Sequence, residues 1–173
     1  MSSIILIAET GSDVTPELAK EYGIHLVPMH VSLGETTLDD GAFPPEEVCA
    51  YYDQTGKVPR TSACNPEDFT VVLDEIHAKY PDKQILHLAY SAVTTCSYQN
   101  ALIASEGRDY IRSVDTKHVS VGQAAVVLAV AQLLRDKPEL RWMKQPRRQS
   151  ALQKALRCAS FPTISTICAL AAA

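Results

Sequence analysis

The sequence has none of the common nucleotide-binding or metal-binding motifs. Neither G-x-G-x-x-G nor G-x-x-x-x-G-K-[ST] occurs, so nucleotide binding through those phosphate loops is not expected. The five cysteines form no C-x-x-C pair, and their odd number favours reduced thiols in a cytoplasm. The five histidines are scattered, and we interpret each as a packing or surface residue. No metal and no cofactor are therefore expected.

Signals for membrane insertion and export are missing as well. No run of 18 apolar residues could form a spanning helix, so no integral membrane segment is expected. The chain enters the apolar run 4–8 with no basic region before it and no cleavage site after it. We therefore expect a first strand there, no signal peptide, and a cytoplasmic protein.

Composition and charge divide the chain into two parts. The 173 residues, 46% of them hydrophobic and 21% charged, suffice for one domain with a substantial core. Residues 1–134 contain 8 Lys and Arg against 18 Asp and Glu, whereas residues 135–173 contain 8 against 2. A basic tail could bind nucleic acid or anionic lipid, but an aberrant or disordered end is the interpretation that we favour. We thus expect one domain over 1–134, an irregular tail over 135–173, and no nucleic-acid partner.

Short apolar runs, typical of buried strands, alternate with longer helical patterns. This order predicts an α/β fold, with a mainly parallel sheet flanked by helices. Thr15 and Asn65 are suited to cap the helices that follow them. Pro28 indicates that the second strand is an edge strand or is interrupted. The expected strands are 4–8, 24–31, 84–90 and 110–114, and the expected helices are 15–22, 44–52, 66–80, 97–106 and 121–134.

Hydroxyl side chains gather at two places in this pattern. The segment 91–101 follows a buried strand and opens a helix, which is where α/β proteins bind ligands. Free N–H groups at a helix start and nearby hydroxyls suit an anionic group. A second hydroxyl pair lies at 61–62, just before another helix. We predict a carboxylate or phosphate site built from Thr61, Ser62, Ser91, Thr94, Thr95 and Ser97.

Two alternatives stay open for these residues. Each hydroxyl taken singly is more often a helix cap than a ligand donor. Ser91 or Cys96 could instead be the nucleophile of a small hydrolase or transferase, which needs a base and an orienting acid nearby. Four acids are expected in loops, where turn and cap roles are favoured over metal binding: Glu9, Asp13, Asp39 and Asp40.

Six segments of the chain match the motifs of one known protein family in the same order. They are I-A-E-T-G-S-D-V-T (7–15), L-V-P-M-H-V (26–31), L-D-D-G (38–41), R-T-S-A-C-N-P (60–66), S-A-V-T-T-C-S-Y-Q-N-A (91–101), and V-D-T with S-V-G-Q (114–116, 120–123). They resemble T-D-S-T-A-D-L-P, V-V-P-L-x-V, Y-x-D-G, K-T-S-Q-P-S-P, S-S-x-L-S-G-T-Y-Q-S-A, and V-D-S with S-x-G-x-G. These are motifs of the DegV family of bacterial fatty-acid-binding proteins.

The resemblance implies a two-domain α/β protein that binds one long-chain fatty acid in a tunnel at the domain junction. A Thr-Ser pair, matched by Thr61 and Ser62, and a Ser-Ser turn hold the carboxylate. In that turn Ser91 matches the first serine, Ala92 replaces the second, and Cys96 replaces a glycine. The resemblance further implies a carrier, not an enzyme, that presents the acid to a fatty acid kinase.

The tail departs from the family, whose members are longer and carry an L-x-x-L-x-x-G-G-R type signature in a second domain. Codons for residues 161–173, read in the shifted frame, can encode P-D-N-L-D-Y-L-R-A-G-G-R. Our hypothesis is a frameshift between about 135 and 160 that replaced the second domain. We expect a disordered or loosely helical end beyond about Pro138. We also expect weak or absent fatty-acid binding by this chain alone, because the tunnel would lack one wall.

Overall fold

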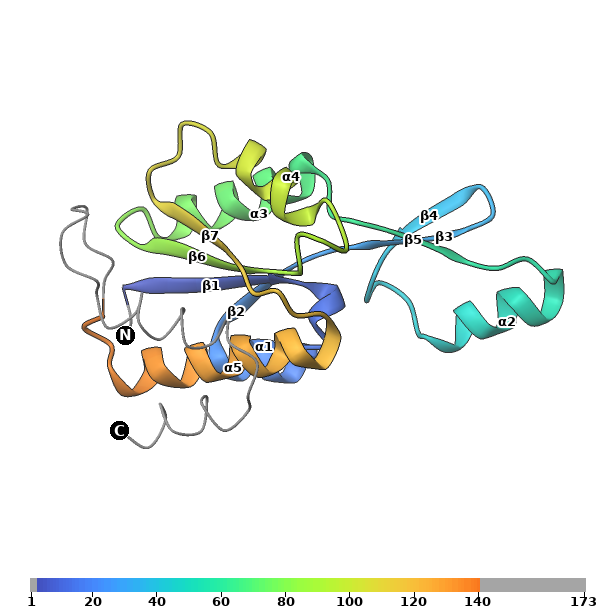
Figure 1. The fold of residues 1–173 in the computed structure, drawn as a ribbon, viewed down its shortest axis with the longest axis horizontal. Coiled ribbons are helices and arrows are strands. Elements are labelled where there is room, and N and C mark those ends of the chain that lie inside the picture. The colour runs from blue at the N-terminus through green and yellow to red at the C-terminus, as the bar shows by residue number, and fades with distance from the viewer. Residues whose placement is uncertain (1–2, 141–173) are drawn as a thin grey trace.

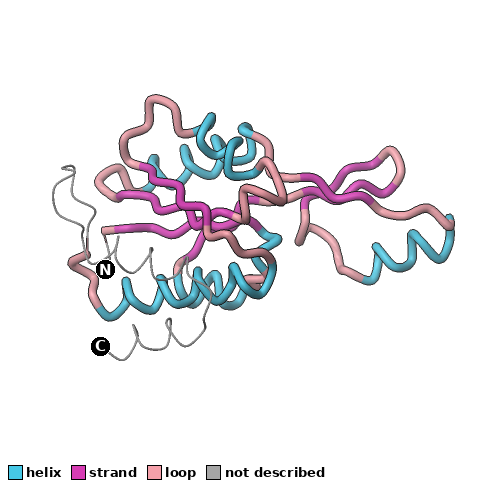
Figure 2. The backbone as a smooth tube through the Cα atoms, in the orientation of Figure 1, coloured by secondary structure: helices cyan, strands magenta, loops and turns pink. Residues whose placement is uncertain are grey.

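The computed structural model describes residues 3–140, which form a body and an arm that projects from it (Figure 1). The arm comprises residues 30–62. Figure 2 shows the body strands between two layers of helices and the strands of the arm extending away from them.

The body is built on a parallel sheet of four strands in the order β2-β1-β6-β7. All six residues of β1 are buried, because this central strand is covered on both faces. The predicted α/β class with a mainly parallel sheet is thus confirmed. The strands are β1 (Ile4–Glu9), β2 (Ile24–Val27), β6 (Gln84–Ala89) and β7 (Ile111–Asp115).

Two helices cover each face of this sheet (Figure 1). Helices α1 (Pro16–Tyr22) and α5 (Ser120–Asp136) lie on one face, and α3 (Pro66–Lys79) and α4 (Ser97–Ala104) on the other. Successive side chains of a strand point to opposite faces, so β1 contributes to both cores. Ile4, Leu6 and Ala8 pack in the first core, and Ile5 and Ile7 pack in the second.

The predicted helix caps are confirmed. The Asn65 side-chain oxygen accepts hydrogen bonds from the N–H groups of Glu67 at 2.8 Å and Asp68 at 3.1 Å. The Thr15 hydroxyl accepts from the Leu18 N–H at 3.3 Å. Both caps fix the helix starts that the sequence indicated. The apolar stripe of α3 faces the core through Phe69, Leu73 and Ile76.

Residues 24–31 do not form one continuous strand, and the edge position and the interruption that Pro28 indicated are both confirmed. The chain leaves the parallel sheet after Val27 and continues as β3 in a second, antiparallel sheet of order β4-β3-β5. Proline has no N–H to donate to a ladder, so the interruption falls at Pro28, and β2 lies at the sheet edge. The arm contains β3 (His30–Leu33), β4 (Thr36–Asp39), α2 (Glu46–Thr55) and β5 (Arg60–Ser62).

Within residues 3–140 no helix is both long enough and apolar enough to cross a membrane. Helix α5 continues to Asp136, two residues past the expected domain boundary. From residue 141 on, the expected tail and the proposed frameshift region lie outside the described residues.

Candidate functional site

The predicted 91–97 segment is the turn between β6 and α4, at the carboxyl end of the parallel sheet. The Ser91 carbonyl accepts hydrogen bonds from the Thr94 N–H at 3.0 Å and from the Thr94 hydroxyl at 2.8 Å. The Thr95 hydroxyl accepts from the Ser97 N–H at 3.2 Å. Thr94 therefore stabilises the turn itself, whereas Thr95 accepts from the first N–H of α4, so a capping role is supported for Thr95 alone.

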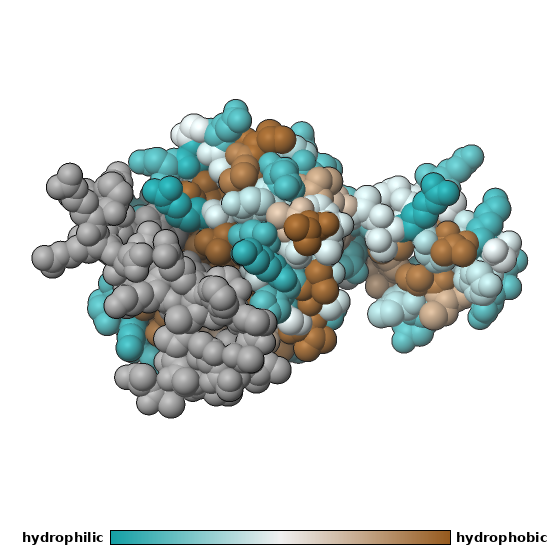
Figure 3. Space-filling model, in the orientation of Figure 1, coloured by the Kyte–Doolittle hydropathy of each residue, from teal (hydrophilic) through white to brown (hydrophobic). Residues whose placement is uncertain are grey.

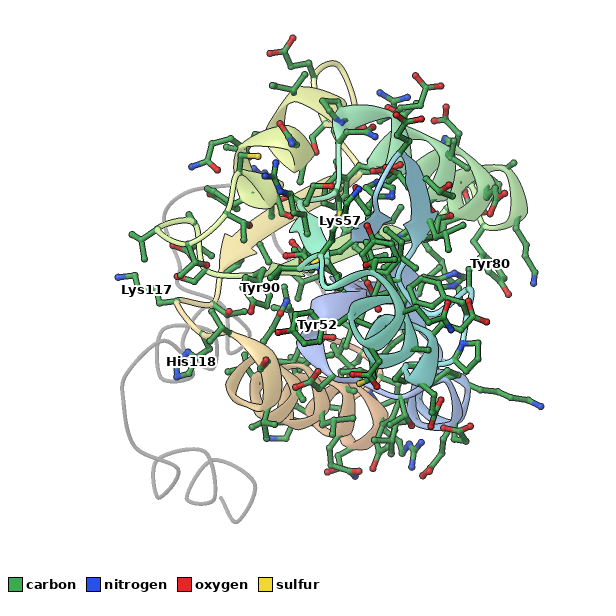
Figure 4. The ribbon with its side chains drawn as sticks, turned by 90° about the vertical axis from the view of Figure 1, so that its right-hand side faces the viewer. Tyr52, Lys57, Tyr80, Tyr90, Lys117 and His118 are labelled. Carbon is green, nitrogen blue, oxygen red and sulfur yellow. The ribbon has the colours of Figure 1, made fainter. Side chains whose placement is uncertain are left out.

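The loop after β7 supports this turn from the side. The Ser91 N–H donates to the His118 carbonyl at 3.0 Å. The Asp115 carboxylate accepts from the N–H groups of Ala92 at 3.2 Å and Lys117 at 2.9 Å. Lys117 has a φ of 59°, a left-handed conformation that is costly for a side-chain-bearing residue and persists only where its surroundings fix it. Figure 4 shows Lys117 and His118 beside each other at the edge of the molecule.

The other two predicted hydroxyls lie on β5 of the arm. In the pairing of β5 with β3, Thr61 is opposite Val31 and Ser62 is opposite His30. Neighbouring residues of a strand point to opposite faces. Thr61 thus shares a face with the apolar Val31, and Ser62 shares the other face with His30. One compact head group is expected to contact only one of these two hydroxyls.

Asn100 joins the segment 60–65 to α4. Its side-chain amide donates to the Cys64 carbonyl at 2.8 Å, and the Cys64 thiol donates to the Val27 carbonyl at 3.6 Å. Cys64 is fully buried, and burial raises the pKa of its thiol far above the ordinary value. Ser97, the first residue of α4, is also fully buried. The two hydroxyl-rich segments therefore meet at Cys64 and Asn100.

The six predicted ligand-binding residues do not share one open surface. Among residues 3–140, no hydrogen bond joins the hydroxyl of Thr61 or Ser62 to the 91–97 turn. A ligand at the exposed hydroxyls would reach the buried ones only if the side chains above them moved. Two of the six are buried (Ser91, Ser97), one is half-buried (Thr95), and three are exposed (Thr61, Ser62, Thr94).

Glu9 was expected in a loop, and this is wrong. It is the last residue of β1 and is completely buried. One carboxylate oxygen lies 3.1 Å from Nε2 of His87. The other accepts from the Tyr90 N–H at 2.9 Å and from the Gln123 side chain at 2.8 Å. Nδ1 of His87 lies 3.2 Å from the Ser113 hydroxyl. The hydrogen bond from the Tyr90 N–H to Glu9 thereby fixes Tyr90, the residue directly before the 91–97 turn.

Burial alone would raise the pKa of Glu9, but the charge and hydrogen bond of His87 hold it below its ordinary value. Sequence reasoning missed this network, although two signals pointed to it. Glu9 directly follows an apolar run, and His87 interrupts another one.

Within the described residues, no group of three or more His, Cys, Asp and Glu is placed to hold a metal ion.

His30 forms a second cluster of titratable groups. Its Nδ1 lies 3.0 Å from Asp39 and its Nε2 lies 2.8 Å from Asp68, one of two acids in the first turn of α3. Asp39 was also expected in a loop, but it is the last residue of β4. Burial alone would lower the pKa of His30, but the hydrogen bonds and charges of Asp68 and Asp39 raise it above its ordinary value.

The geometry does not favour a nucleophile in the 91–97 turn. In the described part of the chain, the Ser91 hydroxyl has no hydrogen bond with a His, Asp or Glu side chain. Cys96 is exposed at the start of α4, and its sulfur accepts from the Asn100 amide at 3.5 Å. Within residues 3–140, neither residue is hydrogen-bonded to a base that could activate a nucleophile.

Comparison with known proteins gives one consistent result. A family model described as "Uncharacterised protein, DegV family" matches residues 3–141. A DegV domain-containing protein of Caldanaerobacter subterraneus is 24% identical over 135 residues, which are 77% of this chain and 48% of that protein. The chain thus spans about half the length of the curated relatives it matches.

Solved structures share the fold. A DegV family protein from Thermus thermophilus, described by its fatty acid binding, superposes with a TM-score of 0.76 at 26% identity. The match covers 91% of this chain and 53% of that one. DegV from Bacillus subtilis, described as a fatty acid binding protein, has a TM-score of 0.74 at 16% identity, over 91% of this chain and 53% of the other. At that identity the second likeness concerns the fold alone.

Proposed function

The chain belongs to the DegV family, and on this premise we propose that it binds a long-chain fatty acid and carries it without chemical change. The fatty acid binding described for the similar Thermus thermophilus protein supports this proposal. The observation that carries it is the contact between Asn100 and Cys64, through which the two hydroxyl-rich segments meet. Ligands of α/β proteins bind at this carboxyl end of the sheet.

Neutral donors would hold the carboxylate of the acid. A hydrogen bond to a charged group contributes about 1.5–3 kcal/mol, so two or three of them suffice without a cationic partner. We expect one donor from Thr61 or Ser62 and the others from the 91–97 turn. The resemblance implies that the acyl chain runs into a tunnel closed by a second domain, as expected for relatives about twice as long as the matched region.

By the same resemblance, the partner that receives the acid is a fatty acid kinase. On this proposal the carrier supplies no catalytic group. Thr61, Ser62 and Thr94 are exposed. This exposure suits a head group that a second protein must reach.

The test is a fluorescence titration of the delipidated full chain with cis-parinaric acid. We expect weak but saturable binding that falls by a further factor of about ten when the one hydroxyl facing the head group is removed, in Thr61→Ala or Ser62→Ala. Thr36→Ala removes another exposed hydroxyl of the arm and should leave binding unchanged. Equal affinities for all four proteins would contradict a hydroxyl-held head group.

A chimaera distinguishes two explanations of weak binding by this chain: a tunnel that lacks one wall, and the absence of any fatty-acid site. It joins residues 1–140 to the second half of the Thermus thermophilus relative. Tight binding by the chimaera and weak binding by the chain alone would support a tunnel shared between two domains. If neither protein binds, and native mass spectrometry finds no co-purifying acid, the proposal fails.

A further inference from the structure

The arm contains a pocket that shares no residue with the proposed fatty-acid site. It has a volume of about 450 Å³ and is lined by Ser32, Gly34, Tyr51, Lys57, Val58 and Arg60. These residues come from the β3–β4 hairpin, from α2, and from the segment between α2 and β5. Figure 4 views the molecule from the end that the arm forms and labels Lys57 there.

A glycine shapes the wall of this pocket. Gly34 has a φ of +69°, and a Cβ placed on it would lie 3.2 Å from the Tyr51 hydroxyl. The missing side chain therefore lets Tyr51 lie against the hairpin turn. Pairing of Ser32 with Arg60 places these two side chains on the same face of the small sheet.

The charge in the pocket is opposite to that of the arm around it. Residues 30–62 contain six Asp and Glu but only two Lys and Arg, and those two, Lys57 and Arg60, both line the pocket. No acid lines it. In the described residues, neither cation takes part in an ion pair, although acids are frequent on the same arm.

We propose that this pocket is an anion site for a phosphate group, carried by a small phosphate ester or by a phospholipid head group. The guanidinium of Arg60 offers a fork of donors, Lys57 a compact charge, and Tyr51 a hydroxyl, the donor set that proteins use for phosphate. Two cations match a dianion better than a single carboxylate. The volume falls within the range of about 300–1,000 Å³ for small-molecule sites, so the group that bears the phosphate also has room.

An NMR titration of the full chain with inorganic phosphate tests the site. Ionic strength is held constant with sodium chloride. We expect saturable shifts of the Gly34, Lys57 and Arg60 amides. The apparent affinity should fall by about fivefold or more in Lys57→Ala and in Arg60→Ala, and saturation should be lost in the double variant. Arg60→Lys keeps the charge without the fork and should bind with intermediate affinity.

Matched controls are Lys20→Ala and Arg112→Ala, exposed cations of the body, which should titrate like the unchanged chain. Shifts that persist in the double variant, or that sodium chloride alone reproduces, would overturn the proposal. The double variant should also keep its affinity for cis-parinaric acid. A negative phosphate titration would therefore not contradict fatty-acid binding. Absence of fatty-acid binding would likewise not contradict the phosphate site.

Two further probes identify the source of the phosphate group. Phenyl phosphate represents a small ester, and phosphatidic acid vesicles with phosphatidylcholine vesicles as control represent a head group that bears a phosphate monoester. Competition by phenyl phosphate without co-sedimentation indicates a soluble ester. Co-sedimentation with phosphatidic acid vesicles alone, lost in the double variant, indicates a head group. If neither probe depends on Lys57 and Arg60, the pocket is not a phosphate site.

Discussion

At the scale of single residues, His30 links the arm to the body. Its two ring nitrogens contact carboxylates from different elements, Asp39 of β4 and Asp68 of α3. A neutral imidazole has only one N–H, so it can donate to only one of these carboxylates. Both contacts are satisfied only by the imidazolium, in agreement with the raised pKa of His30. We therefore expect the contact between arm and body at Asp68 to be stronger when His30 is protonated.

Replacing His30 should cost more stability in mild acid than in base. Because the pKa of folded His30 lies above its ordinary value of 6.5, its contribution is complete below 6.5 and is lost as the pH rises through the folded value. We expect His30→Gln to lower the free energy of unfolding by about 2 kcal/mol near pH 6 and by clearly less near pH 9. Urea unfolding at the two pH values measures this difference.

The control for this pH effect is His25→Gln, because burial lowers the pKa of His25 and thus gives the opposite sign. Asp39→Asn should remove part of the effect, and its coupling with His30→Gln in a double-mutant cycle should vanish in base. A cost of His30→Gln that is the same at both pH values would show that the folded chain does not hold the extra proton.

At the scale of elements, helices α3 and α4 begin in different ways. Asn65 and Asp68 form a reciprocal pair at the start of α3, with the Asp68 carboxylate 2.6 Å from the Asn65 N–H. Cys96 precedes α4 and gives it no side-chain cap. The start of α4 thus depends on Thr95 and on the rest of the 91–97 turn. Fewer of its first N–H groups are hydrogen-bonded to a side chain than at the start of α3.

Asn65→Ala should destabilise the chain by about 1 kcal/mol, because two N–H groups of the first turn of α3 lose their acceptor. Asn65→Asp keeps the acceptor oxygen and should stay close to the unchanged chain. The measurement is the urea midpoint at an unchanged dependence on urea concentration. If both variants lose the same stability, the packing of Asn65 matters and its capping bonds do not.

The elements that could be predicted from the sequence are those with a strong periodic pattern. The strand of Ile85 to Leu88 and the stripe of Phe69, Leu73 and Ile76 form the cores that their spacing indicated. The expected helix 44–52 corresponds to α2, but β4 and β5 of the arm could not be predicted, because they have only four and three residues and read T-T-L-D and R-T-S. Such short polar strands depend on pairing partners distant in the sequence.

The candidate site was predictable as segments but not as a geometry. The sequence indicated the turn at the carboxyl end of β6, and the structure has it there. It did not indicate that Thr61 and Ser62 alternate between faces, because β5 was not recognised as a strand. Nor did it indicate the Glu9–His87 contact, since the two residues meet only when β1 and β6 pair.

At the scale of the whole molecule, body and arm differ in how they are stabilised. The body has two apolar cores, one on each face of its sheet. Helix α2 of the arm has no buried residue and no side-chain cap at its start. Figure 3 shows hydrophobic atoms at the surface of the arm, where Val58 is 75% exposed. A helix of this length has little stability of its own in water, so α2 depends on weak packing against the small sheet.

Hydrogen exchange should therefore find the arm opening independently of the body. We expect the amides of α2 to be protected less than those of α3 by a factor on the order of 100, which corresponds to about 2.7 kcal/mol. Helix α3 is the matched control, because it is also a helix but buries Phe69, Leu73 and Ile76. His30→Gln should speed exchange in β3 and β4 and leave β1 and β6 unchanged, since it removes a contact between arm and body. Equal protection in α2 and α3 would mean that the chain unfolds as one cooperative unit, with the arm as much a part of it as the parallel sheet.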